Sequence, residues 1–338
     1  MNTALTLESP APLRPLNTFG VGGQIDQLLR VRSAAGFDEP ALYAFLQHDD
    51  CLVLGGGSNV LFVRPPRRAV RIEHTYLTCE HEDAAHVVLR VGGGTPWPEL
   101  VEQCTLRGWF GLENLALIPG TAGAAPIQNI GAYGVELVDV LEAVVVRERA
   151  TGAEMRLSAA ACGFGYRTSR FKTEWRGRYL IESIVLRLHK QARVNISYAA
   201  LAQALPEAAT PAEVLAAVCR IRRSKLPDPA EVGSAGSFFQ NPVVGAHVAE
   251  ALRRTWPDLV AYPQPDGQVK LAAGWLIDRC GWRGHRQGDA GTWPAQALVL
   301  VNYGAATGAH IWQLAQDIRA AVEGRFGVRL EPEVQVLA

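Results

Sequence analysis

The sequence lacks an excess of charge of either sign, and it lacks a long hydrophobic run. Its 338 residues include 33 basic and 33 acidic side chains, which excludes the basic surface typical of a general nucleic-acid-binding protein. No apolar run approaches the ~18 residues that span a bilayer. The N-terminal residues also lack the basic and apolar segments of a signal peptide. We therefore expect a cytoplasmic, monomeric protein whose partners are small molecules, with no role for nucleic acid or membrane.

Metal-ligand and nucleophile motifs are also missing. The six cysteines are scattered, with no CxxC pair and no histidine at zinc-ligand spacing, so we expect reduced, mostly buried thiols and no metal site. No GxSxG or HExxH sequence occurs, which disfavours serine hydrolases and zinc proteases. An SxxK sequence at 169–172 lacks the partner motifs of penicillin-recognising enzymes, so we attribute it to chance.

Strand-like and helical patterns are mixed along the chain rather than alternating strictly, which predicts an α+β fold. The β-branched and aliphatic runs predict strands at 51–54, 59–63, 69–72, 87–91, 141–147 and 180–188. Helices are predicted at 38–47, 97–107, 246–254, 270–280 and 309–326, and a last strand at 328–337.

A boundary is predicted after one well-marked helix. Thr210 can cap it, Pro211 suits its first position, and Glu213 completes a capping box. The helix ends at Lys225 because Pro227 and Pro229 prevent its continuation. We expect a new unit to begin there.

Two glycine-rich segments are candidates for a ligand site. Gly55–Gly57 follow a predicted strand, where backbone amides can cradle a phosphate or simply form a tight turn. They match neither the Rossmann nor the P-loop fingerprint. The segment 111–137 is rich in Gly, Ala and Pro and nearly free of charge. It suits either close packing against a flat cofactor or a buried loop between sheets.

Four polar side chains stand out, each with a functional and a structural interpretation. Arg167 suits a carboxylate ligand or a surface ion pair. Ser237 lies between small residues and two phenylalanines, in a position for a reactive hydroxyl or a turn. Glu333 shares one face of a predicted strand with Glu331. The two carboxylates suit either a functional site or a strand edge exposed to solvent. Lys225 is one of four lysines and has the alternative role of a helix C-terminal charge.

Taken together, an ordered set of motifs resembles the UDP-N-acetylenolpyruvoylglucosamine reductase family over almost the whole chain, from Asn17 to Gln335. The motifs are NTFG, GGGSN, IPGTAGAAPIQNIGAYG, GYRTSRFK, KLPDP, GSAGSFFQNP, KLAAGWLID and LEPEV. The resemblance implies two FAD-binding subdomains of the p-cresol methylhydroxylase type, at 1–75 and 76–226. It also implies an α+β substrate domain at 227–338, whose last strand returns to the first subdomain.

The resemblance also implies the reaction and its site. FAD is reduced by NADPH, and the enolpyruvyl group of UDP-N-acetylglucosamine-enolpyruvate then takes the hydride in the same cleft, giving UDP-N-acetylmuramate for peptidoglycan. The implied catalytic residues are Arg167, Ser237 as proton donor, and Glu333. The implied substrate ligands are Tyr198, Lys225, Asn241 and Gln296. The implied FAD ligands are Gly55, Gly56, Gly57, Ser58, Asn59, Ile118, Pro119, Gly120, Ile127 and Gly131.

Some details separate this chain within the family. The segment around Tyr198 resembles the subtype with a tyrosine loop, whereas Gln335 and Trp293 replace an arginine and a histidine frequent in relatives. Two alternatives stay open. One is another FAD-dependent oxidase of the same fold, and the other is a non-catalytic nucleotide-sugar binding protein.

Overall fold

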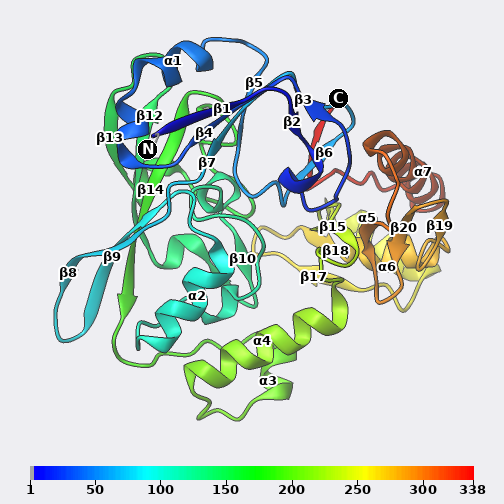
Figure 1. Ribbon diagram of the computed structural model, residues 1–338. Helices are drawn as coiled ribbons and strands as arrows, with labels where there is room; N and C mark the ends of the chain where they lie inside the picture. The colour runs from blue at the N-terminus through cyan, green and yellow to red at the C-terminus, as the bar shows by residue number, and fades with distance from the viewer. Residues whose placement is uncertain (1–3) are drawn as a thin grey trace. The chain divides into compact units, whose positions relative to one another are not determined.

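The computed structural model describes residues 4–338, and the chain forms two compact units (Figure 1). Of the described residues, the first contains 4–11, 25–56 and 66–222. The second contains 12–24, 57–65 and 223–338. The short strands β2 (Ala11–Pro12) and β3 (Gln24–Ile25) lie where the chain passes from one unit to the other.

The first unit contains a four-stranded mixed sheet in the order β1-β4-β7-β5. β1 is antiparallel to β4, while β4, β7 and β5 run parallel. Helix α1 (Pro40–Leu46) buries Leu42 and Leu46 in one cluster with apolar residues of this sheet, because leucines four positions apart lie on one helix face. The strands are β1 (Leu5–Glu8), β4 (Gln27–Val31), β5 (Cys51–Leu54) and β7 (Arg68–Ile72).

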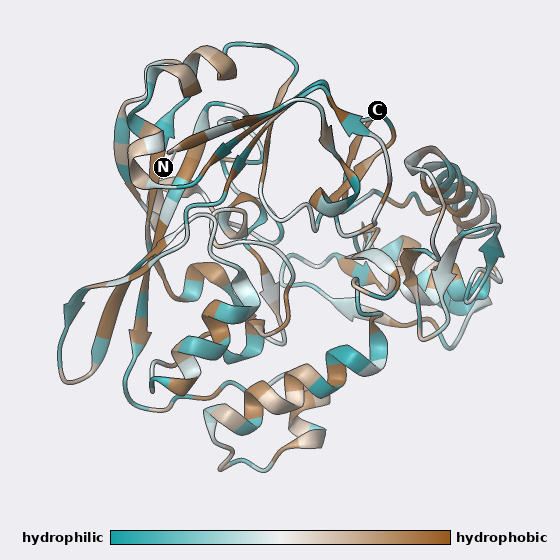
Figure 2. Ribbon diagram, viewed as in Figure 1, coloured by the Kyte–Doolittle hydropathy of each residue, from teal (hydrophilic) through white to brown (hydrophobic). Residues whose placement is uncertain are grey.

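A five-stranded antiparallel sheet completes the first unit, in the order β13-β12-β14-β9-β8. Val87 and Leu89 of β9 join one core cluster, and Val88 joins another, because successive strand residues point to opposite faces. The central strands carry mostly hydrophobic residues (Figure 2). The strands are β8 (Leu77–Glu82), β9 (His86–Gly92), β12 (Leu141–Glu148), β13 (Glu154–Ser158) and β14 (Tyr179–His189).

Helices cover one face of this sheet. Trp97 and Leu100 of α2 and Val214 and Val218 of α4 lie in the same core cluster as Val87. Residues of α4 up to Arg222 belong to this unit. The remaining elements are α2 (Trp97–Leu106), β10 (Gly131–Ala132), β11 (Val135–Glu136), α3 (Ala199–Ala204) and α4 (Pro211–Lys225).

The second unit contains an antiparallel sheet in the order β15-β21-β20-β19 and a three-stranded sheet in the order β16-β18-β17. β6 and β22 form a separate parallel pair. The strands are β6 (Val60–Phe62), β15 (Gly233–Ser237), β16 (Val243–Val244), β17 (Ala261–Pro263), β18 (Val269–Leu271), β19 (Arg286–Gln287), β20 (Ala290–Trp293), β21 (Gln296–Asn302) and β22 (Gln335–Leu337).

Three helices accompany these sheets: α5 (Ala246–Thr255), α6 (Ala273–Arg279) and α7 (Gly308–Phe326). α7 buries Ile311, Leu314, Ile318 and Val322, the helical spacing that the sequence predicts. Among residues 4–338, no helix is both long and apolar enough to cross a bilayer.

The predicted α+β class and the capping box are confirmed. The amide of Thr210 donates to Glu213 Oε2 over 2.7 Å, and the amide of Glu213 donates to Thr210 Oγ1 over 3.3 Å. Two element predictions are wrong at their ends. Lys270 lies in β18, because it pairs with Val243 and Tyr262, so the helix predicted from it begins at Ala273. Within 328–337, only β22 is a strand. The boundaries of the three predicted domains stay a prediction.

Candidate cofactor and substrate site

In the first unit, the two predicted cofactor segments touch each other. An ideal Cβ on Gly56 would stand 2.8 Å from the Gly120 Cα, and one on Gly55 would stand 3.0 Å from the Ala124 Cβ. Backbone packs directly on backbone here, which only glycine permits. Gly120 itself has a φ of +122°. The turn after β5 therefore forms one surface with the segment that contains Ile118, Pro119 and Gly120.

A further glycine turn supports this surface, and the sequence analysis missed it. A Cβ on Gly123 would stand 3.0 Å from the Gly93 Cα, and the Gly123 amide donates to the Gly93 carbonyl over 2.9 Å. The amide of Ala122 donates to the Thr95 carbonyl over 2.8 Å. The signal was available in the sequence, since Gly92–Gly94 repeat the pattern of three glycines after a strand.

Left-handed backbone is concentrated in two of the predicted site segments. Among residues 4–338, the non-glycine residues with positive φ are Leu117, Asn129, Tyr133 and Arg167. Three lie in the segment 111–137, and the fourth is a predicted catalytic residue. Such conformations cost about 1–3 kcal/mol each and persist where the surroundings enforce them, often at functional sites.

Arg167 reaches the second glycine segment. Its guanidinium donates to the carbonyl oxygen of Gly131, and a Cβ on Gly131 would stand 2.8 Å from Arg167 Nη1. The guanidinium carbon also lies 5.3 Å from the centre of the Tyr166 ring. Arg167 therefore contacts Gly131, one of the predicted cofactor ligands. Ile127, another predicted ligand, lies four residues before Gly131 and has 38% of its surface exposed.

Tyr198 belongs to a neighbouring cluster of the first unit. It precedes α3, is 46% exposed, and packs edge to face on Tyr133 at a ring separation of 5.2 Å. Burial raises the pKa of Tyr133. The buried Asn114 holds both segments, since its Nδ2 donates to the carbonyl oxygens of Tyr133 and Asn195, each over 2.8 Å. Tyr198 is therefore presented to solvent from an anchored loop.

In the second unit, the NTFG segment packs against the turn that contains Gly57, Ser58 and Asn59. A Cβ on Gly57 would stand 2.0 Å from the Leu16 carbonyl oxygen, so no larger residue fits. Asn17 is buried and donates through Nδ2 to the Leu13 carbonyl over 2.9 Å. The predicted cofactor turn is thus packed at Gly57 against the backbone of Leu16 and Asn17.

A β-bulge sets the position of Ser237. β15 shifts register against β21 between Ser234 and Ser237, where Gly236 has a φ of +71°. A bulge redirects the side chain that follows it. Ser237 is partly buried, and the two phenylalanines that follow it have no exposed surface. The hydroxyl therefore lies beside a dry apolar core.

The structure brings Glu333 close to Ser237 through the backbone. The Glu333 amide donates to the carbonyl oxygen of Phe238, the residue after Ser237, over 2.8 Å. The Gln240 amide donates to the Glu331 carbonyl over 2.9 Å, so the two segments pair like strands. Asn59 joins them, since its Nδ2 donates to the Glu333 carbonyl over 3.3 Å.

The predicted substrate ligands of the second unit lie in two places. Asn241 and Gln296 both contact the start of α6. Asn241 Oδ1 accepts from the Ala273 amide over 2.9 Å, and a Cβ on Gly274 would stand 2.8 Å from Gln296 Oε1. Lys225 is exposed as the last residue of α4.

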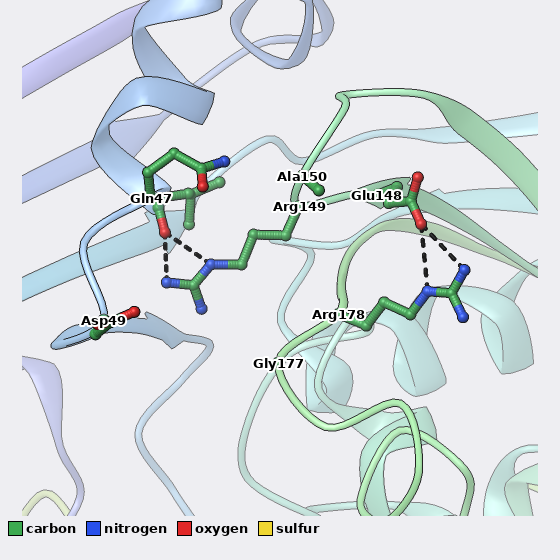
Figure 3. Close-up of a pocket in the computed structure, with 8 residues that line it drawn as sticks. Gln47, Asp49, Glu148, Arg149, Ala150, Gly177 and Arg178 are labelled. Atoms are coloured by element: carbon green, nitrogen blue, oxygen red, sulfur yellow. Dashed lines mark hydrogen bonds and ion pairs between the residues drawn. The ribbon is translucent and has the colours of Figure 1, made fainter.

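An open pocket of the first unit contains none of the predicted site residues (Figure 3). Its two arginines make intramolecular bonds. Arg149 donates to the carbonyl oxygens of Leu46, His48 and Cys51 near the end of α1, and Arg178 bonds Glu148 over 3.1 Å. Among residues 4–338, no group of three or more His, Cys, Asp or Glu side chains is arranged to hold a metal ion.

The sequence matches two known families, one over a range that contains both glycine segments and one over the C-terminal part of the second unit. Residues 40–158 match the family described as FAD binding domain, and residues 228–337 match the C-terminal domain of UDP-N-acetylenolpyruvoylglucosamine reductase. The chain is 49% identical over 341 aligned residues to the reductase of that name from Burkholderia cenocepacia (strain HI2424), which covers 98% of this chain and 97% of the relative. The chain belongs to the UDP-N-acetylenolpyruvoylglucosamine reductase family.

Two further comparisons agree with this membership. The reductase from Burkholderia vietnamiensis (strain G4 / LMG 22486) is 48% identical over 345 residues, again 98% of this chain and 97% of the relative. The crystal structure of the reductase from Thermus caldophilus has a TM-score of 0.67 and 26% identity, covering 99% of this chain and 100% of that one. The predicted family, the FAD-binding fold and the assignment as an FAD-dependent oxidoreductase are confirmed.

Proposed function

We propose that the chain reduces the enolpyruvyl group of UDP-N-acetylglucosamine-enolpyruvate to the lactyl group of UDP-N-acetylmuramate, with NADPH as the source of hydride. Family membership over 98% of the chain supports this substrate and product. FAD held by this chain would supply the hydride chemistry that links NADPH to the vinyl methylene carbon of the substrate. The remaining steps belong to the side chains of this protein.

The glycine surface fits a flat, phosphate-bearing cofactor. Gly55 and Gly56 leave no room for a side chain against the segment that contains Gly120, and backbone amides in such turns suit phosphate oxygens. We assign FAD binding to this surface, with Ile118, Pro119, Ile127 and Gly131 continuing it in the first unit. Gly57, Ser58 and Asn59, which belong to the second unit, are assigned as further FAD ligands.

Ser237 is assigned as the proton donor. Addition of hydride to the methylene carbon leaves a carbanion at the adjacent carbon, which bears the substrate carboxylate. A second C–H bond forms when this carbanion takes the hydroxyl proton of Ser237. A hydroxyl is acidic enough toward so basic a carbon, and a positioned acid contributes roughly 10² to 10⁴ in rate. The bulge that aims Ser237 and the dry phenylalanines beside it support this role.

Arg167 and Glu333 are assigned to the charge that develops on the substrate. A guanidinium binds carboxylate oxygens in a planar, bidentate manner, so Arg167 stabilises the enediolate form of the carbanion. A Glu333 carboxyl that carries a proton donates a hydrogen bond to the same group, from the segment paired with Phe238. Tyr198 and Lys225 are assigned to the nucleotide diphosphate, and Asn241 and Gln296 to polar groups of the substrate.

One hydrogen bond carries this assignment, the 2.8 Å bond from the Glu333 amide to the Phe238 carbonyl. It makes Ser237 and Glu333 neighbours although the sequence separates them widely. A proton donor and a carboxyl group on adjacent backbone segments support a site that protonates a carbon beside a carboxylate.

The experiment is a half-reaction measurement on Ser237→Ala, with Ser234→Ala on the same strand as the matched control. We expect both variants to bleach their flavin absorbance with NADPH under anaerobic conditions. Ser237→Ala is expected to lose substrate-driven reoxidation by roughly 10² to 10⁴, whereas Ser234→Ala keeps it. Equal loss of both half-reactions in Ser237→Ala contradicts the role of this hydroxyl.

The same assay separates the alternative functions. Rapid oxidation of the reduced flavin by oxygen alone favours an oxidase, and tight binding of the nucleotide sugar by a colourless protein favours a binding protein. The cytoplasmic location, the monomeric state, the lack of nucleic-acid or membrane partners and the tyrosine-loop subtype stay predictions.

A further inference from the structure

Arg167 lies in a strained turn. Gly165 and Thr168 exchange two backbone hydrogen bonds, of 3.1 and 3.2 Å, around Tyr166 and Arg167. Arg167 occupies the third position of this turn with a φ of +54°, where glycine is the usual residue. An arginine does not hold this conformation without support, so neighbouring groups must fix the turn.

Asn129 provides the first support. Its side chain has no exposed surface, and its Nδ2 donates to the Gly165 carbonyl over 3.2 Å and to Glu136 Oε2 over 2.7 Å. Its Oδ1 accepts from the Val138 amide over 3.1 Å. One buried amide therefore joins the turn of Arg167 to the hairpin that follows Gly131. Buried amides that lose such partners cost about 1–3 kcal/mol each.

Ser169 provides the second support from the other end of the turn. It is 1% exposed, and its Oγ donates to the Ile127 carbonyl over 2.7 Å. The two sides of the turn are thus bonded to residues 127 and 129 of the same short segment. The guanidinium of Arg167 bonds Gly131, the next residue but one along that segment.

We infer that Asn129 and Ser169 are positioning residues, which clamp the Arg167 turn to the segment Ile127–Gly131 and so fix the guanidinium relative to the bound flavin. The inference rests on the proposed roles of Arg167 and of this segment. A misplacement of about 1 Å of a catalytic group lowers rates by up to roughly 10²-fold, so the clamp acts on the reaction without touching the substrate.

The test uses Asn129→Gly and Ser169→Ala in the holoenzyme. Glycine adopts the φ of +46° seen at Asn129 without strain, so the variant removes the side chain and its bonds without straining the backbone. Thr173→Val is the matched control, because Thr173 Oγ1 donates within the same loop, to the Ser169 carbonyl over 3.1 Å, and not to the cofactor segment.

We expect Asn129→Gly and Ser169→Ala each to slow substrate-driven flavin reoxidation roughly ten- to hundredfold. Flavin reduction by NADPH should stay within about twofold of the parent protein, as should both half-reactions of Thr173→Val. Unchanged reoxidation in Asn129→Gly and Ser169→Ala overturns the inference. If Asn129→Gly does not fold, Ser169→Ala alone decides, since it removes only one hydroxyl.

A double-mutant comparison separates positioning from a general loss of structure. In an Arg167→Lys background, the positioning role predicts that Asn129→Gly has little further effect, because the group it positions is already displaced. A full additional loss in that background overturns the clamp. If Arg167→Lys alone leaves reoxidation unchanged, the proposed role of Arg167 fails instead, so the two failures are distinguishable.

Discussion

Gly56 packs directly on Gly120, and a Cβ on the first would stand 2.8 Å from the Cα of the second. The Gly120 Cα is a backbone atom, so a larger residue at position 56 cannot be accommodated by a side-chain movement. Two segments more than sixty positions apart in the sequence thereby form a single surface.

Gly56→Ala is therefore expected to separate the two segments and weaken FAD binding. Overpacking of this kind costs about 1–3 kcal/mol, which corresponds to a loss of about five- to 150-fold in FAD affinity. The measurement is the flavin-to-protein absorbance ratio after purification, followed by titration with FAD. Gly324→Ala is the control, since nothing lies within 4 Å of its new Cβ and alanine suits the interior of α7. Full flavin retention by Gly56→Ala would refute the expectation.

Glu182 holds two arginines in the five-stranded sheet, and Glu182→Ala should destabilise the first unit strongly. Its carboxylate is 6% exposed and lies 2.6 Å from Arg147 Nε and 3.2 Å from Arg90 Nη2. Removing one partner of a buried ion pair costs about 3–5 kcal/mol. The exposed pair of Arg170 and Glu174 is the comparison, since Glu174→Ala should cost less than about 1 kcal/mol. Thermal unfolding of both variants measures the difference, and equal midpoints would contradict it.

Cysteine reactivity should follow burial. Burial raises the pKa of Cys104 to about 12 and the pKa values of Cys51 and Cys162 to about 11, whereas Cys79 is exposed on β8. The thiolate is the reactive form. Iodoacetamide at about pH 8 should therefore label Cys79 well before the other three. Peptide mass spectrometry checks this order, and denaturant should remove it. Early labelling of Cys104 in the native protein would argue against it.

Glu113→Gln should stabilise the protein at neutral pH. The side chain is 3% exposed, and burial raises the pKa of its carboxyl although the Gly111 amide donates to it over 2.9 Å. A raised pKa means that the folded state binds the proton more tightly than the unfolded state does. The stability of the protein therefore falls as pH rises from the pKa of this carboxyl in the unfolded state to above its pKa in the folded state. Glutamine keeps the acceptor and removes the charge. The gain in unfolding midpoint should be present at about pH 8 and shrink at about pH 4; a gain independent of pH would exclude charge as the cause.

Local sequence signals predicted the elements that local chemistry determines. The capping box of Thr210 and Glu213 and the apolar spacing of α7 are short-range features, and both are confirmed. Helical spacing predicts that Lys270 lies in a helix. This prediction is wrong because spacing along the chain cannot reveal that Val243 and Tyr262 pair with Lys270. Long-range pairing decides such residues.

The sequence predicts which residues belong to the candidate site, but it does not predict how they are arranged in space. No periodicity indicates the left-handed φ of Arg167, because its turn is held by the distant Asn129 and by the bond from Ser169 to the distant Ile127. The bulge before Ser237 and the bond from Glu333 to Phe238 are likewise long-range. The second glycine turn, Gly92–Gly94, was visible in the sequence and was overlooked.

The parallel pairing of β22 with β6 has a consequence for biosynthesis. Gln335 pairs with Val60, so the second unit is assembled from residues near both ends of the 338-residue chain. During translation, Val60 leaves the ribosome long before Gln335 is synthesised. β6 therefore stays without its neighbouring strand while the first unit folds. Strands that wait unpaired are prone to aggregate. Synthesis of the β22 residues therefore sets the earliest moment at which this pair of strands can form.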